Sequence, residues 1–293
     1  MSPLDSSVVT ASAAAPRRLP AFVRFLIAAV WVIAVFFGSG VVFGLLHGHT
    51  LLPALLYRLL GCALAMGGFA FLLRVLDLDE RPLDAALGLP LSRGALRGWL
   101  YGLALGAALM SLDAGAIAIF GSLQLHMHFS AALLLRGGII FVTLFWAALL
   151  EELCFRGYPF EKLVESLGAT GAVLALSALF GALHLGNPNA GGLWSFGFWN
   201  TLLVGVLFAL ARLRTGNLWF PFGLHLGWNL FQGSVFGLPV SGLSDFATVI
   251  TATVHGSHRL TGGGYGPEAS ATCCVLLILS LPVLWSITTP RHT

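Results

Sequence analysis

The sequence predicts an all-α integral membrane protein, a polytopic helix bundle with about eight transmembrane helices. Two observations lead to this prediction. Of the 293 residues, 57% are hydrophobic and only 9% are charged, and the mean hydropathy is +0.90, whereas a soluble domain has about 25% charged residues. The apolar residues also form runs of about 20 residues, the length that a helix needs to cross the hydrocarbon core of a bilayer.

Each expected span is an apolar run of about 17 to 25 residues with few charges. The expected spans are residues 22–46, 52–76, 97–122, 133–155, 170–186, 194–213, 217–236 and 270–288. Internal glycines and prolines do not exclude them, because neighbouring helices can satisfy the freed backbone groups in a membrane. The first three spans and the last contain no diagnostic motif.

The positive charges predict the orientation, because Lys and Arg are enriched in cytoplasmic loops of membrane proteins. With the N-terminus inside, twelve of the fifteen Lys and Arg residues fall on inner segments, and the exceptions are Arg58, Arg136 and Arg259. We therefore expect a multi-pass protein of a bacterial-type plasma membrane with a cytoplasmic N-terminus. The net charge is only +3 and the arginines are scattered over loop positions, so nucleic acid is not an expected partner.

Three polar clusters interrupt the apolar sequence in the second half of the chain. They are Glu151-Glu152-x-x-x-Arg156, Phe180-x-x-x-His184 and His225-x-x-x-Asn229. Each contains a pair spaced i, i+4, which shares one face of a helix, and ionisable groups inside a membrane indicate a functional site by default. If the fourth helix continues to a turn near residues 168–171, Glu151 and His184 differ in depth by about 6 Å. The clusters are therefore expected to meet in one cavity that admits water.

The residue types in these clusters suit hydrolysis. Glu151 can act as a general base on water, and a neutral His184 can orient that water or carry its proton. His225 and Asn229 can donate hydrogen bonds to the oxyanion of a tetrahedral intermediate. The clusters contain no serine or cysteine with a base at the right spacing, so activated water is favoured over a covalent acyl intermediate. Phe180 suits packing and substrate contact equally.

A metal centre is the alternative chemistry. Glu151, His184 and His225 would form a reasonable zinc ligand set with water in the open position. The sequence contains no H-E-x-x-H, and the two histidines belong to different helices, so spacing does not define a ligand geometry. The sequence therefore requires no cofactor and leaves zinc open.

At these residues the chain resembles the CPBP family of intramembrane proteases, which includes the Ras-converting CAAX endoprotease and the bacterial Abi, or bacteriocin-immunity, proteins. The family pattern is E-E-x-x-x-R, then F-x-x-x-H, then H-x-x-x-N or D, and all three motifs stand here in order on separate apolar helices. The resemblance covers about residues 135 to 235. It implies an endopeptidase of membrane-associated proteins or peptides, with a prenylated CAAX protein as one substrate class. Family members have also been called metalloproteases.

The resemblance also implies a role for each motif residue. Glu151 matches the glutamate that activates water, and His184 matches the histidine beside it. His225 and Asn229 match the groups that stabilise the oxyanion. The supporting residues are Glu152, Arg156 and Phe180.

Two other functions remain open from the sequence. The chain could be a catalytically silent membrane adaptor that regulates a partner such as a sensor kinase or an envelope factor, although its intact motifs argue against this. A transporter with a proton-coupled relay is disfavoured, because the chain lacks paired broken helices in two repeated halves.

The predicted organisation is a single domain with flanking segments. Residues 1–20 are expected to form a disordered tail, 21–130 the N-terminal transmembrane helices and 131–236 the catalytic helix core. The Gly/Ser/Thr-rich residues 237–269 are expected to form a flexible loop, and residues 270–293 the last transmembrane helix and a tail.

Overall fold

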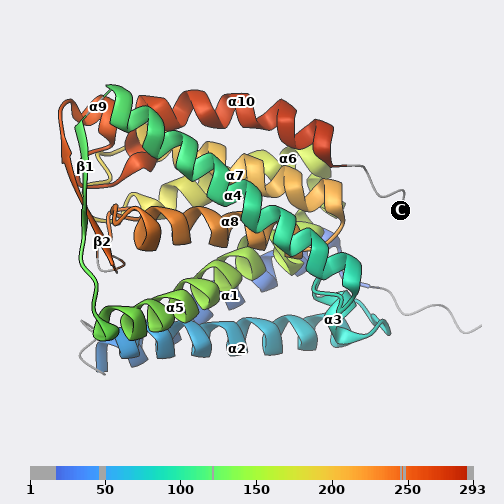
Figure 1. Ribbon diagram of the computed structural model, residues 1–293. Coiled ribbons are helices and arrows are strands. Elements are labelled where there is room, and N and C mark those ends of the chain that lie inside the picture. The colour runs from blue at the N-terminus through green and yellow to red at the C-terminus, as the bar shows by residue number, and fades with distance from the viewer. Residues whose placement is uncertain (1–17, 46–50, 121, 245, 247–248, 289–293) are drawn as a thin grey trace, which may run out of the picture.

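The computed structural model describes residues 18–45, 51–120, 122–244, 246 and 249–288, and the chain is mostly helical (Figure 1). Residues 1–17 of the expected disordered tail lie outside the described residues. The long helices are α1 (Ala21–Leu45), α2 (Leu51–Val75), α4 (Arg93–Phe120), α5 (Ala131–Arg156), α6 (Tyr158–His184), α7 (Phe196–Thr215), α8 (Trp219–Leu230) and α10 (Ala271–Ile287). Each of the eight expected spans overlaps one of them.

Short elements connect the long helices. They are α3 (Leu83–Ala86), the π-helix η1 (Phe231–Val235), α9 (His258–Thr261), the 3-10 helix η2 (Pro267–Ala269), and the strands β1 (Ser122–Met127) and β2 (Ile250–His255). The π-helix η1 continues α8 directly, so these two elements together occupy the seventh expected span.

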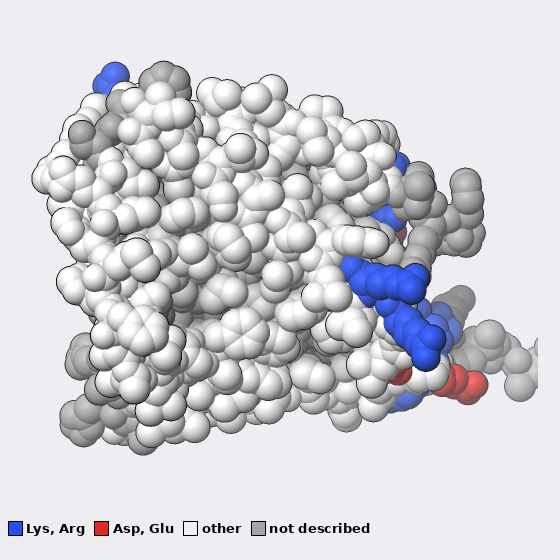
Figure 2. All heavy atoms as spheres, in the orientation of Figure 1, with Lys and Arg blue, Asp and Glu red and all other residues white. Residues whose placement is uncertain are grey.

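Five segments in the described part of the chain are long and apolar enough to cross a membrane. One of them, Ala131–His184, has 54 residues and contains both α5 and α6, whereas α8 has 12 residues and α10 has 17. The expected number of about eight spans is therefore not confirmed. Figure 2 shows Lys and Arg side chains gathered at the end of the molecule where α3 lies, while the broad face beside them is nearly free of charge.

A small sheet departs from the expected all-α fold. Strands β1 and β2 pair antiparallel, with Ser122 opposite His255 and Met127 opposite Ile250. Residues 237–269, expected as a flexible loop, contain β2, α9 and η2, and Glu268 is buried among them. The sequence of β2, ITATVH, is rich in β-branched residues that favour strands. The prediction of a flexible loop comes from the average composition of residues 237–269, in which glycine and serine outweigh these six residues.

Two glycines interrupt the helical chain that leads from Glu151 to His184. Helix α5 ends at Arg156 because Gly157 has φ −83° and ψ −137°, and Pro159 lies in the first turn of α6. Gly168, inside α6, has φ +74° and ψ 168°, a backbone conformation that glycine adopts without steric cost. The expectation of one helix continuing from Glu152 to residue 168 is therefore wrong at Gly157, while the break near residue 168 is present.

Glycines allow α4 and α8 to pack with their backbones in contact. A Cβ added at Gly102 or Gly106 of α4 would lie 2.2 or 2.1 Å from a carbonyl oxygen of α8. The same holds in reverse at Gly223 and Gly227 of α8, at 2.1 and 2.2 Å from carbonyl oxygens of α4. Both pairs have the small-x-x-x-small spacing that brings transmembrane helices together. This contact fixes the helix that contains His225 and Asn229.

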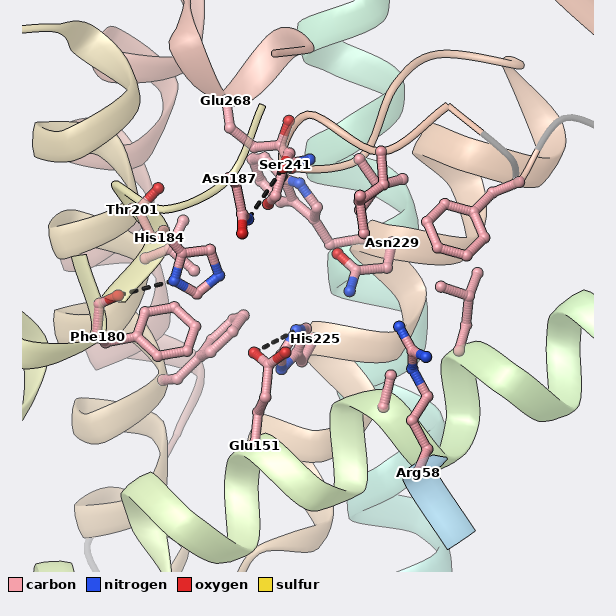
Figure 3. A pocket seen from close by; sticks show the side chains of 18 residues that line it. Arg58, Glu151, Phe180, His184, Asn187, Thr201, His225, Asn229, Ser241 and Glu268 are labelled. Carbon is pink, nitrogen blue, oxygen red and sulfur yellow. Dashed lines mark hydrogen bonds and ion pairs between the residues drawn. The ribbon is translucent and has the colours of Figure 1, made fainter. Parts of the chain in front are cut away.

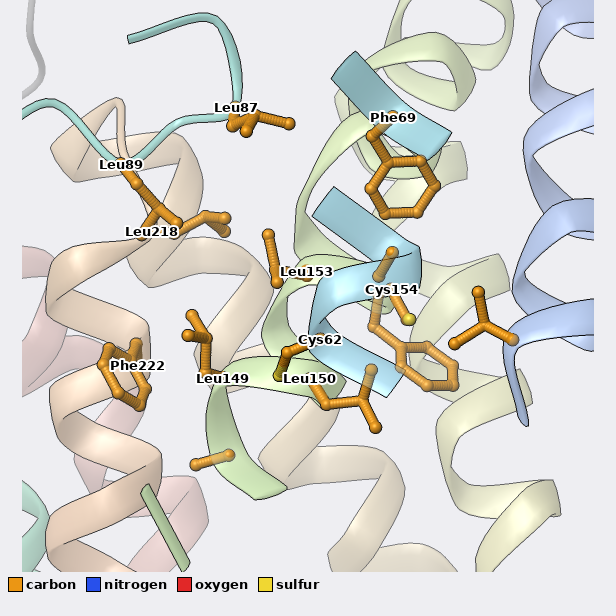
Figure 4. Packing of buried hydrophobic residues seen from close by; sticks show 14 of the residues in the cluster. Cys62, Phe69, Leu87, Leu89, Leu149, Leu150, Leu153, Cys154, Leu218 and Phe222 are labelled. Atoms are coloured by element: carbon orange, nitrogen blue, oxygen red, sulfur yellow. The ribbon is translucent and has the colours of Figure 1, made fainter. Parts of the chain in front are cut away.

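Apolar side chains hold α5 against its neighbours. Cys62 and Phe69 of α2 belong to one buried cluster with Leu150 and Cys154 of α5, and Phe222 of α8 joins it (Figure 4). Closely packed apolar side chains gain dispersion contacts, and van der Waals packing is what associates helices in a membrane. The cluster therefore fixes the end of α5 on which the two glutamates lie.

Candidate active site

The adjacent glutamates at the end of α5 lie in different environments, because successive residues of a helix point about 100° apart. The Glu152 side chain is fully buried, and its Oε1 lies 3.2 Å from Nη1 of Arg156 one turn later. The Glu151 side chain is 30% exposed and lines a cavity. The expected ion pair of Glu152 and Arg156 is therefore present, and Glu151 is not part of it.

Aromatic rings surround the buried Arg156. Its guanidinium carbon lies 4.5 Å from the ring centroid of Phe180 and 5.3 Å from that of Phe208. Its Nη2 donates a hydrogen bond to the Gly205 carbonyl at 3.3 Å. Cation–π contacts are strongest where the cation is removed from water. The Phe180 ring thus packs on Arg156, and it also lines the cavity.

His225, on α8, lies between the two glutamates. Its Nδ1 is 3.0 Å from Glu152 Oε1, and its Nε2 is 3.8 Å from Glu151 Oε2. Its ring stacks on Phe208 with the centroids 4.9 Å apart. An ionised Glu152 only accepts hydrogen bonds, so Nδ1 of His225 holds a proton in this arrangement. In the neutral ring Nε2 is an acceptor, and in the doubly protonated ring it can donate to a ligand.

His184, at the end of α6, is oriented by its own helix. Its Nδ1 lies 2.7 Å from the Phe180 carbonyl oxygen, and the two rings are 4.5 Å apart between centroids. A carbonyl oxygen only accepts hydrogen bonds, so Nδ1 holds the proton and Nε2 of the neutral ring is an acceptor. The half-buried imidazole lies at the cavity, opposite Glu151 (Figure 3).

One cavity of about 100 Å³ brings most of the expected site residues together (Figure 3). The expected residues that line it are Glu151, Phe180, His184, His225 and Asn229. The other two, Glu152 and Arg156, lie behind the wall and do not line it. In the described part of the chain, the Asn229 amide makes no hydrogen bond, so it is available to a bound molecule.

The cavity is also lined by polar residues that the motifs did not single out. These are Arg58 of α2, Asn187 and Thr201, and Ser241 and Glu268 from the segment before α10. Arg58 was visible only as a charge within an apolar run, and Glu268 only as the lone carboxylate close before the last span. Burial raises the pKa of Glu268 to about 7, although donors at Gln232 and Ser241 act in the opposite direction.

The zinc ligand set that the sequence left open is Glu151, His184 and His225. Among the described residues, no three His, Cys, Asp or Glu side chains are grouped closely enough to hold a metal ion. Nε2 of His225 lies 3.8 Å from Oε2 of Glu151, while His184 lies opposite Glu151 at the cavity (Figure 3). In the described part of the chain these three side chains are thus not grouped as a zinc site, and no step of the proposed chemistry uses a metal.

Ionisable groups inside a membrane protein indicate a functional site by default. The family described as type II CAAX prenyl endopeptidase Rce1-like matches residues 133–231, which extend from α5 to the start of η1. This match is consistent with the CPBP resemblance, and all three motifs lie within it. The comparisons with curated proteins and with solved structures give no significant match.

Proposed function

We propose that this protein is an intramembrane endopeptidase that hydrolyses a peptide bond of a membrane-associated protein or peptide by means of water activated by Glu151. The observation that supports this most directly is that Glu151, His184, His225 and Asn229, from three apolar helices, line one cavity. All four lie within the range that matches a CAAX endopeptidase family.

Glu151 is the general base in this proposal. Its partly exposed carboxylate can accept a proton from a water molecule in the cavity, while Glu152 is engaged with Arg156 and His225. The Nε2 atom of His184 accepts a second hydrogen bond from the same water and orients it. The proton that Glu151 receives is then delivered to the leaving amine, so that the base becomes the acid of the second step.

His225 and Asn229 stabilise the oxyanion in this proposal. They lie one turn apart on α8 and both line the cavity. The Asn229 amide donates from its NH₂ group, and a doubly protonated His225 donates from Nε2. The carboxylates on both sides of His225 offset the positive charge that this requires.

Glu152, Arg156 and Phe180 are supporting residues. Glu152 accepts from both Arg156 and His225, so it fixes the orientation of the imidazole relative to Glu151. Hydrogen-bonding partners of this kind keep a catalytic group within the narrow range of positions that catalysis needs. Phe180 covers the guanidinium and supplies, through its carbonyl oxygen, the acceptor for His184.

The proposed substrate is a membrane-associated protein or peptide, including the prenylated CAAX class that the family description names. A catalytically silent adaptor is less favoured, because the base, the second histidine and the oxyanion donors are all retained at one cavity. We further propose that the charged end of the molecule is cytoplasmic, as the distribution of Lys and Arg predicts (Figure 2).

Terminal-peptide mass spectrometry tests the function and identifies the substrate together. Membranes of the native host with wild-type protein are compared with membranes containing Glu151→Gln, which keeps the side-chain shape and removes the base. New protein termini should appear with the wild type and disappear with Glu151→Gln. Glu80→Gln, at an exposed carboxylate on the charged end, is the matched control and should behave as wild type. Identical termini with folded wild type and Glu151→Gln would favour the adaptor.

A further inference from the structure

A short segment between η1 and β2 forms part of the cavity wall. This roof segment, residues 238–244, contributes Val240, Ser241 and Leu243 to the cavity wall. It turns back on itself, with hydrogen bonds between Val240 and Leu243 in both directions at 2.8 and 2.9 Å. Ser241 has φ +48°, a conformation that costs a non-glycine residue free energy and persists where surrounding contacts hold it. The contacts that hold Ser241 are therefore informative.

Glu268 supplies the first of these contacts. Its Oε1 accepts from the Ser241 backbone N–H at 3.0 Å and from the Ser241 hydroxyl at 3.1 Å (Figure 3). Its Oε2 accepts from Nε2 of Gln232 in η1. Asn200 of α7 donates to its backbone carbonyl at 2.8 Å. Glu268 is 5% exposed, so this carboxylate is a fixed part of the interior.

Asn187 supplies the second contact and connects the roof segment to His184. Its side-chain amide donates to the Ser241 carbonyl at 3.0 Å, and its backbone N–H donates to the His184 carbonyl at 3.1 Å. The next residue, Gly242, packs against the chain that follows α6. A Cβ at Gly242 would lie 2.1 Å from the Pro188 carbonyl oxygen. A continuous hydrogen-bonded chain therefore runs from Glu268 through Ser241 and Asn187 to the end of α6.

From these contacts we infer that Glu268 is a positioning residue, which acts through Ser241 and Asn187 to hold the roof segment over the cavity and to fix the end of α6 that presents His184. The effects on kcat and KM that follow from this inference rest on the proposed function. Ser241 donates to Glu268 through its N–H and hydroxyl, and its carbonyl oxygen accepts from Asn187. Loss of the Glu268 acceptor therefore releases both the roof segment and Asn187. The function of Glu268 requires an acceptor oxygen at this place and does not require the negative charge.

Two substitutions of Glu268 separate these requirements. Glu268→Gln keeps one oxygen that can accept from Ser241 and loses only the acceptor for Nε2 of Gln232, so it should retain kcat within about threefold of wild type. Glu268→Ala removes the acceptor and should lower kcat at least tenfold with a smaller change in KM, because His184 is displaced while most of the cavity wall remains. Equal losses in both variants, or a wild-type kcat in Glu268→Ala, would overturn the inference.

Asp113→Ala is the matched control, since Asp113 is another buried carboxylate, on α4, and does not line the cavity. It should leave kcat per folded molecule unchanged. Asn187→Ala should resemble Glu268→Ala, and the double variant should lose no more than either single one, because both break the same chain. Additive losses would show that Asn187 and Glu268 act separately and would contradict the proposed chain.

A labelling experiment tests the roof segment without any peptidase assay. Ala147 lines the cavity on α5, one turn before Glu151. In the Ala147→Cys background, Glu268→Ala should raise the rate of reaction with a water-soluble maleimide at least tenfold, and Glu268→Gln should not. Equal rates in all three proteins would overturn the inference even if the protein proves to be a peptidase. Faster labelling in Glu268→Ala alone would support the inference even if no substrate is cleaved.

Discussion

Gly227→Ala should force α4 and α8 apart and should weaken both stability and activity. A Cβ at Gly227 would lie 2.2 Å from the Leu103 carbonyl oxygen, whereas real Cβ atoms essentially never come closer than 3.0 Å. The helices must therefore separate locally by about 0.8 Å, the difference between these two distances. Overpacking of this kind costs about 1 to 3 kcal/mol. Gly227 lies between His225 and Asn229, and a displacement of about 1 Å can lower a catalytic rate about 100-fold.

Thermal unfolding in detergent, followed by tryptophan fluorescence, measures the first effect, and substrate cleavage per folded molecule measures the second. Gly115→Ala is the matched control, because it makes the same exchange on α4 at a place where a Cβ meets nothing within 4 Å. Alanine is the better helix former by up to about 1 kcal/mol, so this control should not be destabilised. Equal unfolding temperatures for the two variants would refute the close-packing argument.

Three further predictions concern buried charges and metal. Arg156→Ala should cost about 3 to 5 kcal/mol of stability, because Glu152 stays buried without its guanidinium; an unchanged unfolding temperature would contradict this. The pKa of Glu268 is about 7 in the fold and 4.5 ordinarily, so its contribution to stability is complete below pH 4.5 and is lost as the pH rises through 7. The free energy of unfolding of wild type should thus fall by about 3 kcal/mol relative to that of Glu268→Gln over this pH range. Parallel curves of unfolding temperature against pH for the two proteins would contradict the raised pKa. Excess EDTA should leave cleavage unchanged, whereas a loss that zinc restores would favour a metal mechanism.

Apolar run length predicts the helices well, because a membrane-spanning segment must satisfy its backbone hydrogen bonds internally. Each expected span therefore overlaps a helix. Run length does not predict where a helix is interrupted, because the breaks at Gly157 and Gly168 depend on one backbone conformation each. It also misses strand β2, whose pairing with β1 joins residues far apart in the chain. The contact of α4 with α8 could have been inferred from the Gly-x-x-x-Gly pairs on both helices.

In the candidate site too, contacts within one helix could be predicted from the sequence, whereas contacts between distant segments could not. The i, i+4 motifs place Glu152 beside Arg156 and put both histidines on faces that reach the cavity, because helical spacing determines these neighbours. No local pattern connects Glu268 with Ser241, since they lie 27 residues apart in irregular chain. A single carboxylate among glycines and serines resembles a solvated loop residue until the fold buries it.

The two adjacent glutamates show how a polar site can be stable within apolar helices. A buried carboxylate is costly unless a partner and hydrogen bonds compensate its charge, and Glu152 has Arg156 at 3.2 Å and His225 at 3.0 Å. Glu151 instead lines the cavity with 30% of its side chain exposed, and its Oε2 lies 3.8 Å from Nε2 of His225. One helix can thus present a buried, paired carboxylate and a partly exposed carboxylate from neighbouring positions, because they face about 100° apart. The chemistry proposed for Glu151 depends on this division, since a base that was already paired with Arg156 could not accept a proton from water as readily.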